Sequence, residues 1–156
     1  MGKNILFVAL APALLLTGGC KAQNQDHDPI IQVENDDKAM NNAKAEAQRT
    51  LPTFLAYLEK PSATVTDLGF KFPLGGAEHI WVSDVRRDGD TLVGKLANMP
   101  AMAGHSLGEE VKVPLKDVSD WAARVNGKMQ GHYTTRVLLD ELAPDEAAVI
   151  KQNFGW

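Results

Sequence analysis

The sequence predicts an α+β fold: a curved antiparallel β-sheet of about five or six strands, with an N-terminal helix and short C-terminal helices. Three observations support this prediction. Residues 37–60 carry apolar side chains at helical spacing, residues 65–134 contain short β-rich runs separated by turn residues, and residues 136–154 return to a helical pattern.

The first helix is expected to begin at Asp36 or Asp37, because an aspartate side chain can accept hydrogen bonds from a first helical turn. Pro52 lies inside the segment, so we expect either a kink or a second helix start capped by Thr50. Pro61 ends the element. The apolar positions of its buried face are Met40, Ala43, Ala47, Leu51, Phe54, Leu55 and Leu58.

Strands are expected at residues 65–72, 79–86, 91–97, 111–113, 119–125 and 129–134. Asp88-Gly89 joins two of these runs and predicts a β-hairpin. The run 79–86 has apolar residues on both faces, which indicates a central strand covered on both sides.

Asn126-Gly127 predicts a second hairpin, whose register depends on the length of its loop. A three-residue loop that begins at Val125 places Trp121 opposite Gly131 and Ala123 opposite Met129. We predict this register because it keeps apolar side chains on one face.

Two helical segments are expected to follow the sheet. The first covers residues 136–142. The second opens at Pro144, where Asp145 and Glu146 suit the positive end of the helix dipole. Its apolar face carries Ala147, Ile150 and Phe154.

Residues 1–19 have the anatomy of a secretory signal peptide: Lys3, an apolar stretch over residues 5–16, and small residues before Cys20. A stretch of about 12 residues spans about 18 Å as a helix, which is too short for a hydrocarbon core of about 30 Å. Residues 16–20 resemble the bacterial lipobox, which makes Cys20 the expected site of lipidation. The residue after Cys20 is Lys21. By resemblance to bacterial lipoproteins, a lysine at this position favours the outer membrane, facing the periplasm, if the source is Gram-negative.

Residues 20–36 are mostly polar and are expected to form the lipid anchor and a disordered tether, which leaves residues 37–156 as one domain. The composition, with 44% hydrophobic and 23% charged residues, is typical of globular proteins. Acidic side chains (20) outnumber basic ones (16), and no basic cluster is present, so a nucleic acid is not an expected partner.

Residues 104–108 match the G-x-S-x-G pattern of serine hydrolases, but the strand and helix that this motif needs on either side are not predicted. Met99, Met102 and His105 form an M-x-x-M-x-x-H series whose soft ligands suit Cu(I). Packing of the methionines and solvation of the histidine is the preferred interpretation. No metal or other cofactor is therefore predicted.

Glu78, His79, Trp81 and Asp84 form the densest polar and aromatic group in any predicted strand. This group is interpreted as a candidate ligand or interaction patch. A structural hydrogen bond between Glu78 and His79 is the alternative, because no third group follows at catalytic spacing.

Several segments together resemble the YegJ-like bacterial proteins, whose shared segment is called domain of unknown function 2314. They are Glu78-His79-Ile80-Trp81-Val82, Asp88-Gly89-Asp90, Leu96-Ala97-Asn98-Met99-Pro100, Asp120-Trp121, Asn126-Gly127-Lys128 and residues 131–139. The resemblance covers about residues 38–142. It departs from the family pattern at Ala122-Ala123, where bulkier residues are usual. It implies no established activity, and it adds Tyr133 and Arg136 to the candidate patch.

We therefore expect a non-enzymatic binding or interaction module, held at the membrane by the lipid on Cys20, that contacts an envelope protein or a small ligand. One alternative is a small hydrolase that uses His79 with Asp84 or Glu78. The other is a copper-binding protein.

Overall fold

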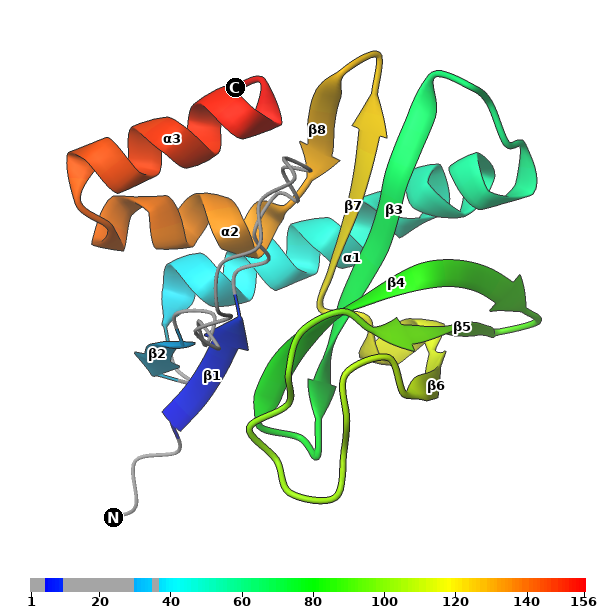
Figure 1. Cartoon of the computed structure of the whole chain (residues 1–156), viewed down its shortest axis with the longest axis horizontal. Helices are drawn as coiled ribbons and strands as arrows, with labels where there is room; N and C mark the ends of the chain where they lie inside the picture. The colour runs from blue at the N-terminus through cyan, green and yellow to red at the C-terminus, as the bar shows by residue number, and fades with distance from the viewer. Residues whose placement is uncertain (1–4, 10–29, 35–36) are drawn as a thin grey trace, which may run out of the picture.

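A computed structural model describes residues 5–9, 30–34 and 37–156 (Figure 1). The elements in chain order are β1 (Ile5–Ala9), β2 (Ile30–Glu34), α1 (Lys38–Glu59), β3 (Val65–Leu74), β4 (Glu78–Asp88), β5 (Thr91–Leu96), β6 (Glu110–Pro114), η1 (Leu115–Asp117), β7 (Asp120–Val125), β8 (Lys128–Gly131), α2 (Tyr133–Leu138), η2 (Leu139–Glu141) and α3 (Pro144–Phe154).

Strands β3 to β8 pair antiparallel in the order β6-β5-β4-β3-β7-β8. β1 adds parallel to the first residues of β4, and β2 adds antiparallel to β1. The predicted α+β class, with an N-terminal helix and short C-terminal helices, is confirmed. β4 is an internal strand, as predicted, because it pairs with β3 on one edge and with β1 and β5 on the other.

The sheet is bent within β4. The pairing of β4 with β3 ends at Val82, and the pairing with β5 shifts register between Ser83 and Arg86. Asp84 lies inside this bulge and has a φ of 51°, which changes the direction of the strand. As a result, the second half of β4, together with β5 and β6, lies across the direction of β3 and β7 (Figure 1).

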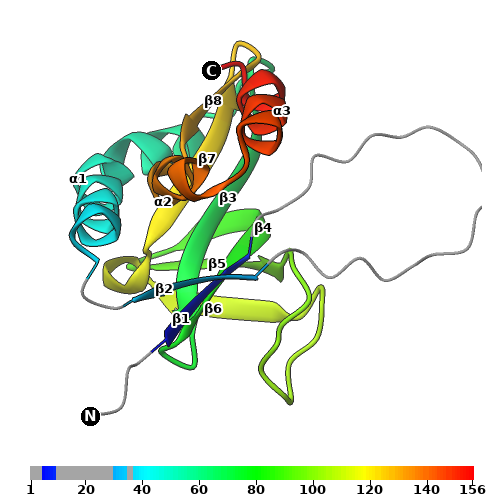
Figure 2. The same ribbon diagram turned by 90° about the vertical axis from the view of Figure 1, so that its left-hand side faces the viewer.

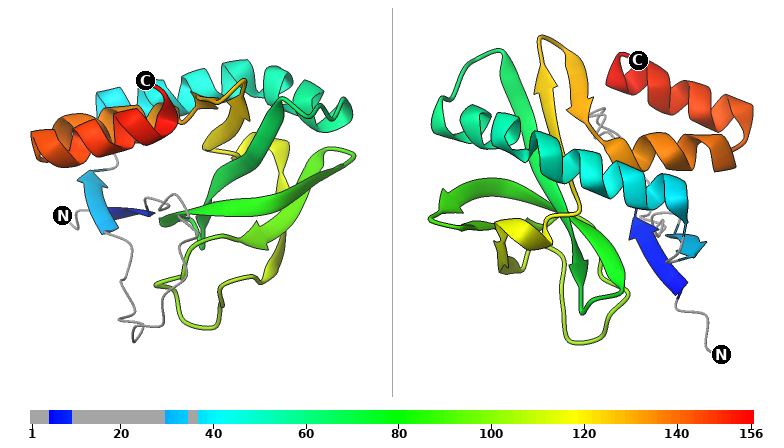
Figure 3. Two further views of the ribbon diagram at one scale, coloured as in Figure 1. Left: turned by 45° about the horizontal axis from the view of Figure 1, so that its top comes forward. Right: turned by 180° about the vertical axis from the view of Figure 1, so that it is seen from behind.

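Helix α1 begins where the sequence predicts, since the Asp37 side chain accepts a hydrogen bond of 2.7 Å from the Met40 N–H. The helix continues through Pro52 to Glu59, so Thr50 does not start a second helix. Its buried residues, Met40, Ala47, Leu51 and Phe54, lie on the predicted face. The helix crosses the sheet over β3 and β7 (Figure 3).

The predicted register of the second hairpin is wrong by one residue. Val125 pairs with Lys128 and Ala123 with Gln130, which leaves a two-residue loop of Asn126 and Gly127. Both loop residues have positive φ, 50° and 82°, as a type I′ turn requires.

The alternation of apolar residues could not decide this register because both faces of the hairpin are covered. Trp121 and Ala123 belong to the core cluster that includes the buried residues of α1. Ala122 and Met129 belong to a second cluster with Phe154 of α3. Helices α2 and α3 lie beside β8 (Figures 1 and 2). Helix α1 lies behind the sheet in the view of Figure 1.

The last predicted strand is also too long, because β8 ends at Gly131 rather than at Thr134. His132 is left-handed, with φ 53°, and α2 begins at Tyr133 instead of at residue 136. The reason is Asp120, whose carboxylate accepts the backbone N–H groups of Tyr133 and Thr134 at 3.1 and 2.8 Å. Those two N–H groups lie in the first turn of α2, which this distant carboxylate caps.

Helix α3 begins at Pro144 and buries Ala147 and Phe154, as predicted. In the part of the chain that the structure describes, no helix is long and apolar enough to span a membrane. Cys20 lies outside the described residues. The strands β1 and β2 fall within the predicted leader and tether, whose boundaries stay predictions.

Candidate functional site

A fully buried polar network lies at the junction of β3, β7 and α2. Lys71 and Asp120 both have no exposed surface. The Lys71 Nζ atom donates to Thr134 Oγ1 at 3.0 Å, and that hydroxyl donates to Asp120 Oδ2 at 2.6 Å. Burial lowers the pKa of Lys71 to about 8, although the charge of Asp120 acts in the opposite direction. Burial likewise raises the pKa of Asp120, and Lys71 opposes that rise.

Trp81 is buried between this network and the C-terminal helices. The Lys71 Nζ atom lies 4.6 Å from the centroid of the Trp81 ring, within the range of a cation–π contact. Trp81 also contacts His132, with 4.6 Å between the two ring centroids. The His132 ring in turn lies 4.6 Å, centroid to centroid, from the ring of Phe154. Trp81 therefore connects the polar network to α3 and serves packing rather than an open binding surface.

The Glu78 side chain binds the loop between β5 and β6. Its two carboxylate oxygens accept the backbone N–H groups of Ala101 and Met102 at 2.9 and 3.0 Å. Consecutive side chains of a strand point to opposite faces, so His79, the next residue, turns away from it. The alternative interpretation, a hydrogen bond between Glu78 and His79, is therefore wrong.

His79 instead bonds to Ser119, with 2.7 Å between Nδ1 and Oγ. The imidazole is 5% exposed. Burial lowers the pKa of His79 to about 3, and the positive charges of Lys44 and Lys71 add to this effect. The side chain is therefore neutral at physiological pH.

A hollow of about 440 Å³ opens at His79, between α1, the β3–β4 turn and the segment before β7. Lys44 and Gln48 of α1 form one wall, and Lys116 lies opposite. The Gln48 side-chain amide fixes the two walls together, because it donates to the carbonyl oxygens of Leu115 (3.0 Å) and Val118 (2.5 Å).

The hollow has a positive character. Lys44 is half-buried, and none of the ion pairs within the described residues includes it. Burial lowers the pKa of Lys44, while the charge of Asp37 partly restores it. Asp117 contributes one carboxylate to the lining, against the ammonium groups of Lys44 and Lys116. A small anion would be stabilised here by two cations and by the polar groups of Ser119 and His79.

Tyr133 and Arg136 line a different hollow, of about 340 Å³, between α1, β8 and α2. Arg136 stacks on Trp156, with 3.7 Å between its guanidinium carbon and the centre of the indole ring. Its Nε–H donates to the Gly131 carbonyl oxygen at 3.3 Å. The Tyr133 ring meets Trp121 edge-on, with 6.0 Å between the ring centroids.

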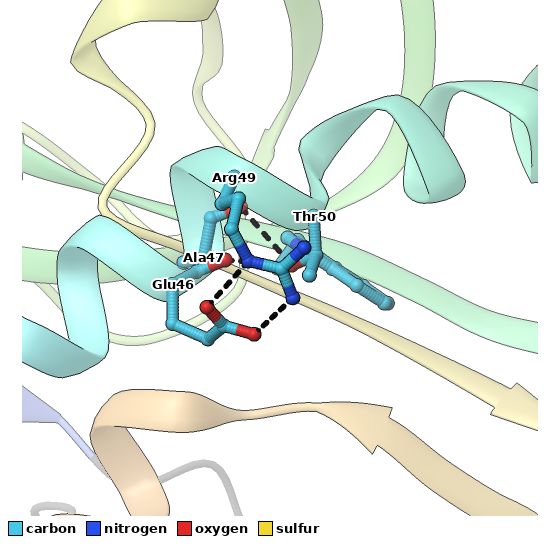
Figure 4. Close-up of polar contacts among 5 residues, drawn as sticks. Glu46, Ala47, Arg49 and Thr50 are labelled. Carbon is cyan, nitrogen blue, oxygen red and sulfur yellow. Dashed lines mark hydrogen bonds and ion pairs between the residues drawn. The ribbon is translucent and has the colours of Figure 1, made fainter.

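Two polar residues of α1 near this second hollow are already engaged (Figure 4). Arg49 binds the Glu46 carboxylate through Nε at 2.7 Å. The Thr50 hydroxyl donates to the Glu46 carbonyl oxygen at 2.8 Å and accepts a hydrogen bond of 3.0 Å from the Trp121 indole.

The six predicted patch residues are thus distributed over several sites. His79 lies at one hollow, Tyr133 and Arg136 at another, and Trp81 lies in the core. Asp84 is on the surface, where it forms an ion pair of 3.2 Å with Lys95. Neither Glu78 nor Asp84 contacts His79 in the hydrogen bonds and ion pairs of the described residues, so the geometry gives no support to a hydrolase built from these groups.

The three residues of the copper alternative have different surroundings. Met99 is 55% exposed, whereas Met102 packs against the main core. His105 is paired with Glu109, with 3.0 Å between Nδ1 and Oε1. Ser106, the serine of the G-x-S-x-G pattern, lies in the exposed loop before β6. This position agrees with the sequence, which does not predict the strand and helix that the motif needs on either side.

The sequence interpretation missed most of the polar residues that the structure brings together. Lys44, Lys71, Lys116 and Ser119 have no local motif. Asp120 is different, because an aspartate at the start of an apolar strand, next to a tryptophan, is an unusual choice that signals a buried partner.

Comparison with known proteins identifies the family. The model described as "Uncharacterized protein conserved in bacteria (DUF2314)" matches residues 37–156, which include both hollows and the buried network. The chain belongs to this family. The resemblance to YegJ-like proteins is thereby confirmed. The matched segment of the DUF2314 family begins at the N-cap of α1 and ends with the last residue.

Two known proteins are similar to the chain over 81% of its length. "Uncharacterized protein YegJ" of Escherichia coli (strain K12) is 28% identical over 131 residues, which cover 81% of this chain and 84% of that protein. "Putative ankyrin repeat protein" of Neisseria meningitidis serogroup B is 29% identical over 139 residues, but the chain spans only 54% of its length. No solved structure matches the chain.

Proposed function

We propose that the chain is a lipid-anchored protein of the cell envelope, and that its DUF2314 domain is a non-enzymatic module that binds a small anion at the His79 hollow. The observation that carries the binding proposal is the half-buried Lys44 ammonium, which has no ion pair in the described part of the chain and faces the same hollow as Lys116. A cation held in this way is stabilised by an incoming negative charge.

His79 supports a binding role rather than a catalytic one. A general base needs a pKa near the working pH and a partner that orients it toward substrate. With a pKa of about 3, His79 is a poor base at neutral pH, and its Nδ1 atom is held by Ser119. When the serine donates to Nδ1, the ring keeps an Nε2–H group that can donate to an anion.

The binding proposal is tested by titrating the purified protein with phosphate, succinate and acetate and following the His79 ring by NMR. An anion in the hollow favours the imidazolium, so saturation is expected to raise the pKa of His79. Lys44→Met keeps the aliphatic chain but removes the charge, and we expect at least about tenfold weaker binding. Lys151→Met, an exposed lysine on α3, is the matched control and should bind as the wild type does.

Two results would contradict the binding proposal. The first is equal affinity of Lys44→Met and wild-type protein for every anion tested. The second is turnover of a phosphoester or peptidoglycan substrate that is lost in His79→Ala, which would make the domain an enzyme.

The envelope proposal rests on Cys20 and is tested separately. The intact mass of the protein from its native host should include a diacylglycerol on Cys20. Cys20→Ser is expected to leave the membrane fraction, and a variant that stays there would argue against the lipid anchor.

A further inference from the structure

We propose that the hollow at Tyr133 and Arg136 is a second binding site, which takes a small organic carboxylate with an aromatic or other flat apolar body. This site is separate from the His79 hollow, because the two share no lining residue. Binding at this second site can therefore be tested independently of binding at the anion site.

Arg136 is the group that binds the carboxylate. Its guanidinium carbon lies 3.7 Å from the centre of the Trp156 indole ring, and its Nε–H donates to the Gly131 carbonyl oxygen, so two contacts restrict the position of the group. Among residues 37–156, no carboxylate forms an ion pair with it. Arginine has five N–H donors, so both terminal nitrogens remain for a bidentate contact with a ligand carboxylate.

The apolar body of the ligand is matched by the lining of the hollow. Both aromatic rings line it: Tyr133 is half-buried and meets the buried Trp121 ring edge-on. A volume of about 340 Å³ is at the lower end of the range for ligand pockets, which suits one ring with a short acidic arm.

Polar groups at the rim add specificity. Thr50 is committed to Glu46 and Trp121, and Gln130 accepts the Tyr57 hydroxyl through its side-chain oxygen at 2.8 Å. The amide nitrogen of Gln130 and the hydroxyl of Tyr133 form no hydrogen bond to another described residue, and both belong to residues that line the hollow. These groups can donate to the second oxygen of the ligand or to a ring substituent.

The test uses matched probes with the purified full chain: phenylacetate, its uncharged amide phenylacetamide, and acetate. Binding is followed by the NMR signal of the Trp156 indole N–H, because the Trp156 ring contacts the Arg136 guanidinium and its N–H donates to the Met129 carbonyl oxygen at 2.9 Å. We expect phenylacetate to bind at least about tenfold more tightly than either control, because only phenylacetate has both the charge and the ring.

Substitutions then assign the site. Arg136→Gln is expected to weaken phenylacetate binding at least about tenfold, Arg136→Lys to give an intermediate affinity, and Tyr133→Phe to give a smaller loss. Arg86→Gln removes another surface arginine, which pairs with Glu110, and should bind as the wild type does. Lys44→Met should also leave phenylacetate binding unchanged, which separates this site from the anion site.

The proposal is overturned if phenylacetate does not bind below about 10 mM, if the amide binds equally well, or if folded Arg136→Gln or Arg136→Lys keeps wild-type affinity. Thermal unfolding of each variant shows whether it is folded. Should Arg136→Gln fail to fold, the comparison of Arg136→Lys with Tyr133→Phe still decides the role of the guanidinium.

Discussion

The Lys71 ammonium and the Asp120 carboxylate lie in the core without exposed surface, and the Thr134 hydroxyl joins them through hydrogen bonds of 3.0 and 2.6 Å. Asp120 also accepts the backbone N–H groups of Trp121, Tyr133 and Thr134. A buried charge pair of this kind holds β3, β7 and α2 in one arrangement, because each charge needs the other to offset its loss of hydration.

Lys71→Met is expected to lower the free energy of unfolding by about 3–5 kcal/mol, since it leaves the Asp120 carboxylate without its cation. Urea denaturation at pH 7 measures this loss. In Lys71→Met/Asp120→Asn the second change removes the uncompensated charge, so part of the stability should return. Losses that simply add in the double variant would show that the two side chains do not act as a pair.

Gly131→Ala is expected to be more destabilising than Gly127→Ala, although both glycines have positive φ, 74° and 82°. A Cβ atom at Gly131 would lie 2.0 Å from the Trp121 carbonyl oxygen, whereas at Gly127 nothing lies within 4 Å. We expect a loss of about 1–2 kcal/mol at Gly127 from backbone strain alone, and at least about 3 kcal/mol at Gly131. Similar unfolding free energies for the two variants would contradict the close approach of β8 to Trp121.

The stability of the folded state is expected to depend on His132 between pH 3 and 6.5. Burial lowers the pKa of His132 to about 3, with smaller contributions from Lys71 and Arg136. In this window the unfolded chain binds a proton that the folded chain excludes. The free energy of unfolding therefore falls as the pH is lowered, by up to about 1.4 kcal/mol per pH unit for this group.

His132→Asn tests that expectation, because asparagine tolerates the left-handed backbone at this position, where φ is 53°. The variant should be less stable at pH 7, since the ring contact with Trp81 is lost. Its unfolding free energy, measured in urea at pH 7, 6 and 5, should also change less with pH. An unchanged pH slope would mean that His132 is not the titrating group.

Phe54→Ala is expected to cost about 3–5 kcal/mol, because the ring is fully buried and packs on Trp121 with 5.7 Å between the ring centroids. Val149→Ala removes apolar atoms from a side chain that is 57% exposed, and should change stability by less than about 0.5 kcal/mol. If the two variants lost equal unfolding free energy in thermal or urea unfolding, this would contradict the packing of α1 on the core through Phe54.

Local signals predicted the parts of the fold that local physics decides. The Asp37 cap, the buried face of α1, the Asp88-Gly89 hairpin and the start of α3 at Pro144 each depend on residues within a few positions of one another. The β8–α2 boundary does not. It depends on Asp120, which caps Tyr133 and Thr134 from 13 and 14 residues away.

The candidate site was harder to predict because its polar residues come from distant parts of the chain. Lys71 stands between Phe70 and Phe72, a pattern typical of a strand with its lysine in water, yet its partner Thr134 is 63 residues further on. Conversely, Glu78 and His79 are neighbours in the sequence but serve different contacts, since strand geometry separates their side chains. Adjacency in the chain was the misleading signal.

The burial of Lys71 also makes this side chain a chemical reporter of folding. The other lysines in residues 37–156 are half-buried or exposed and should react with an acylating reagent in the native protein, whereas Lys71 is shielded on all sides. Acylation of this single amine, read by peptide mass spectrometry, would therefore count the molecules that have opened their core during the labelling pulse.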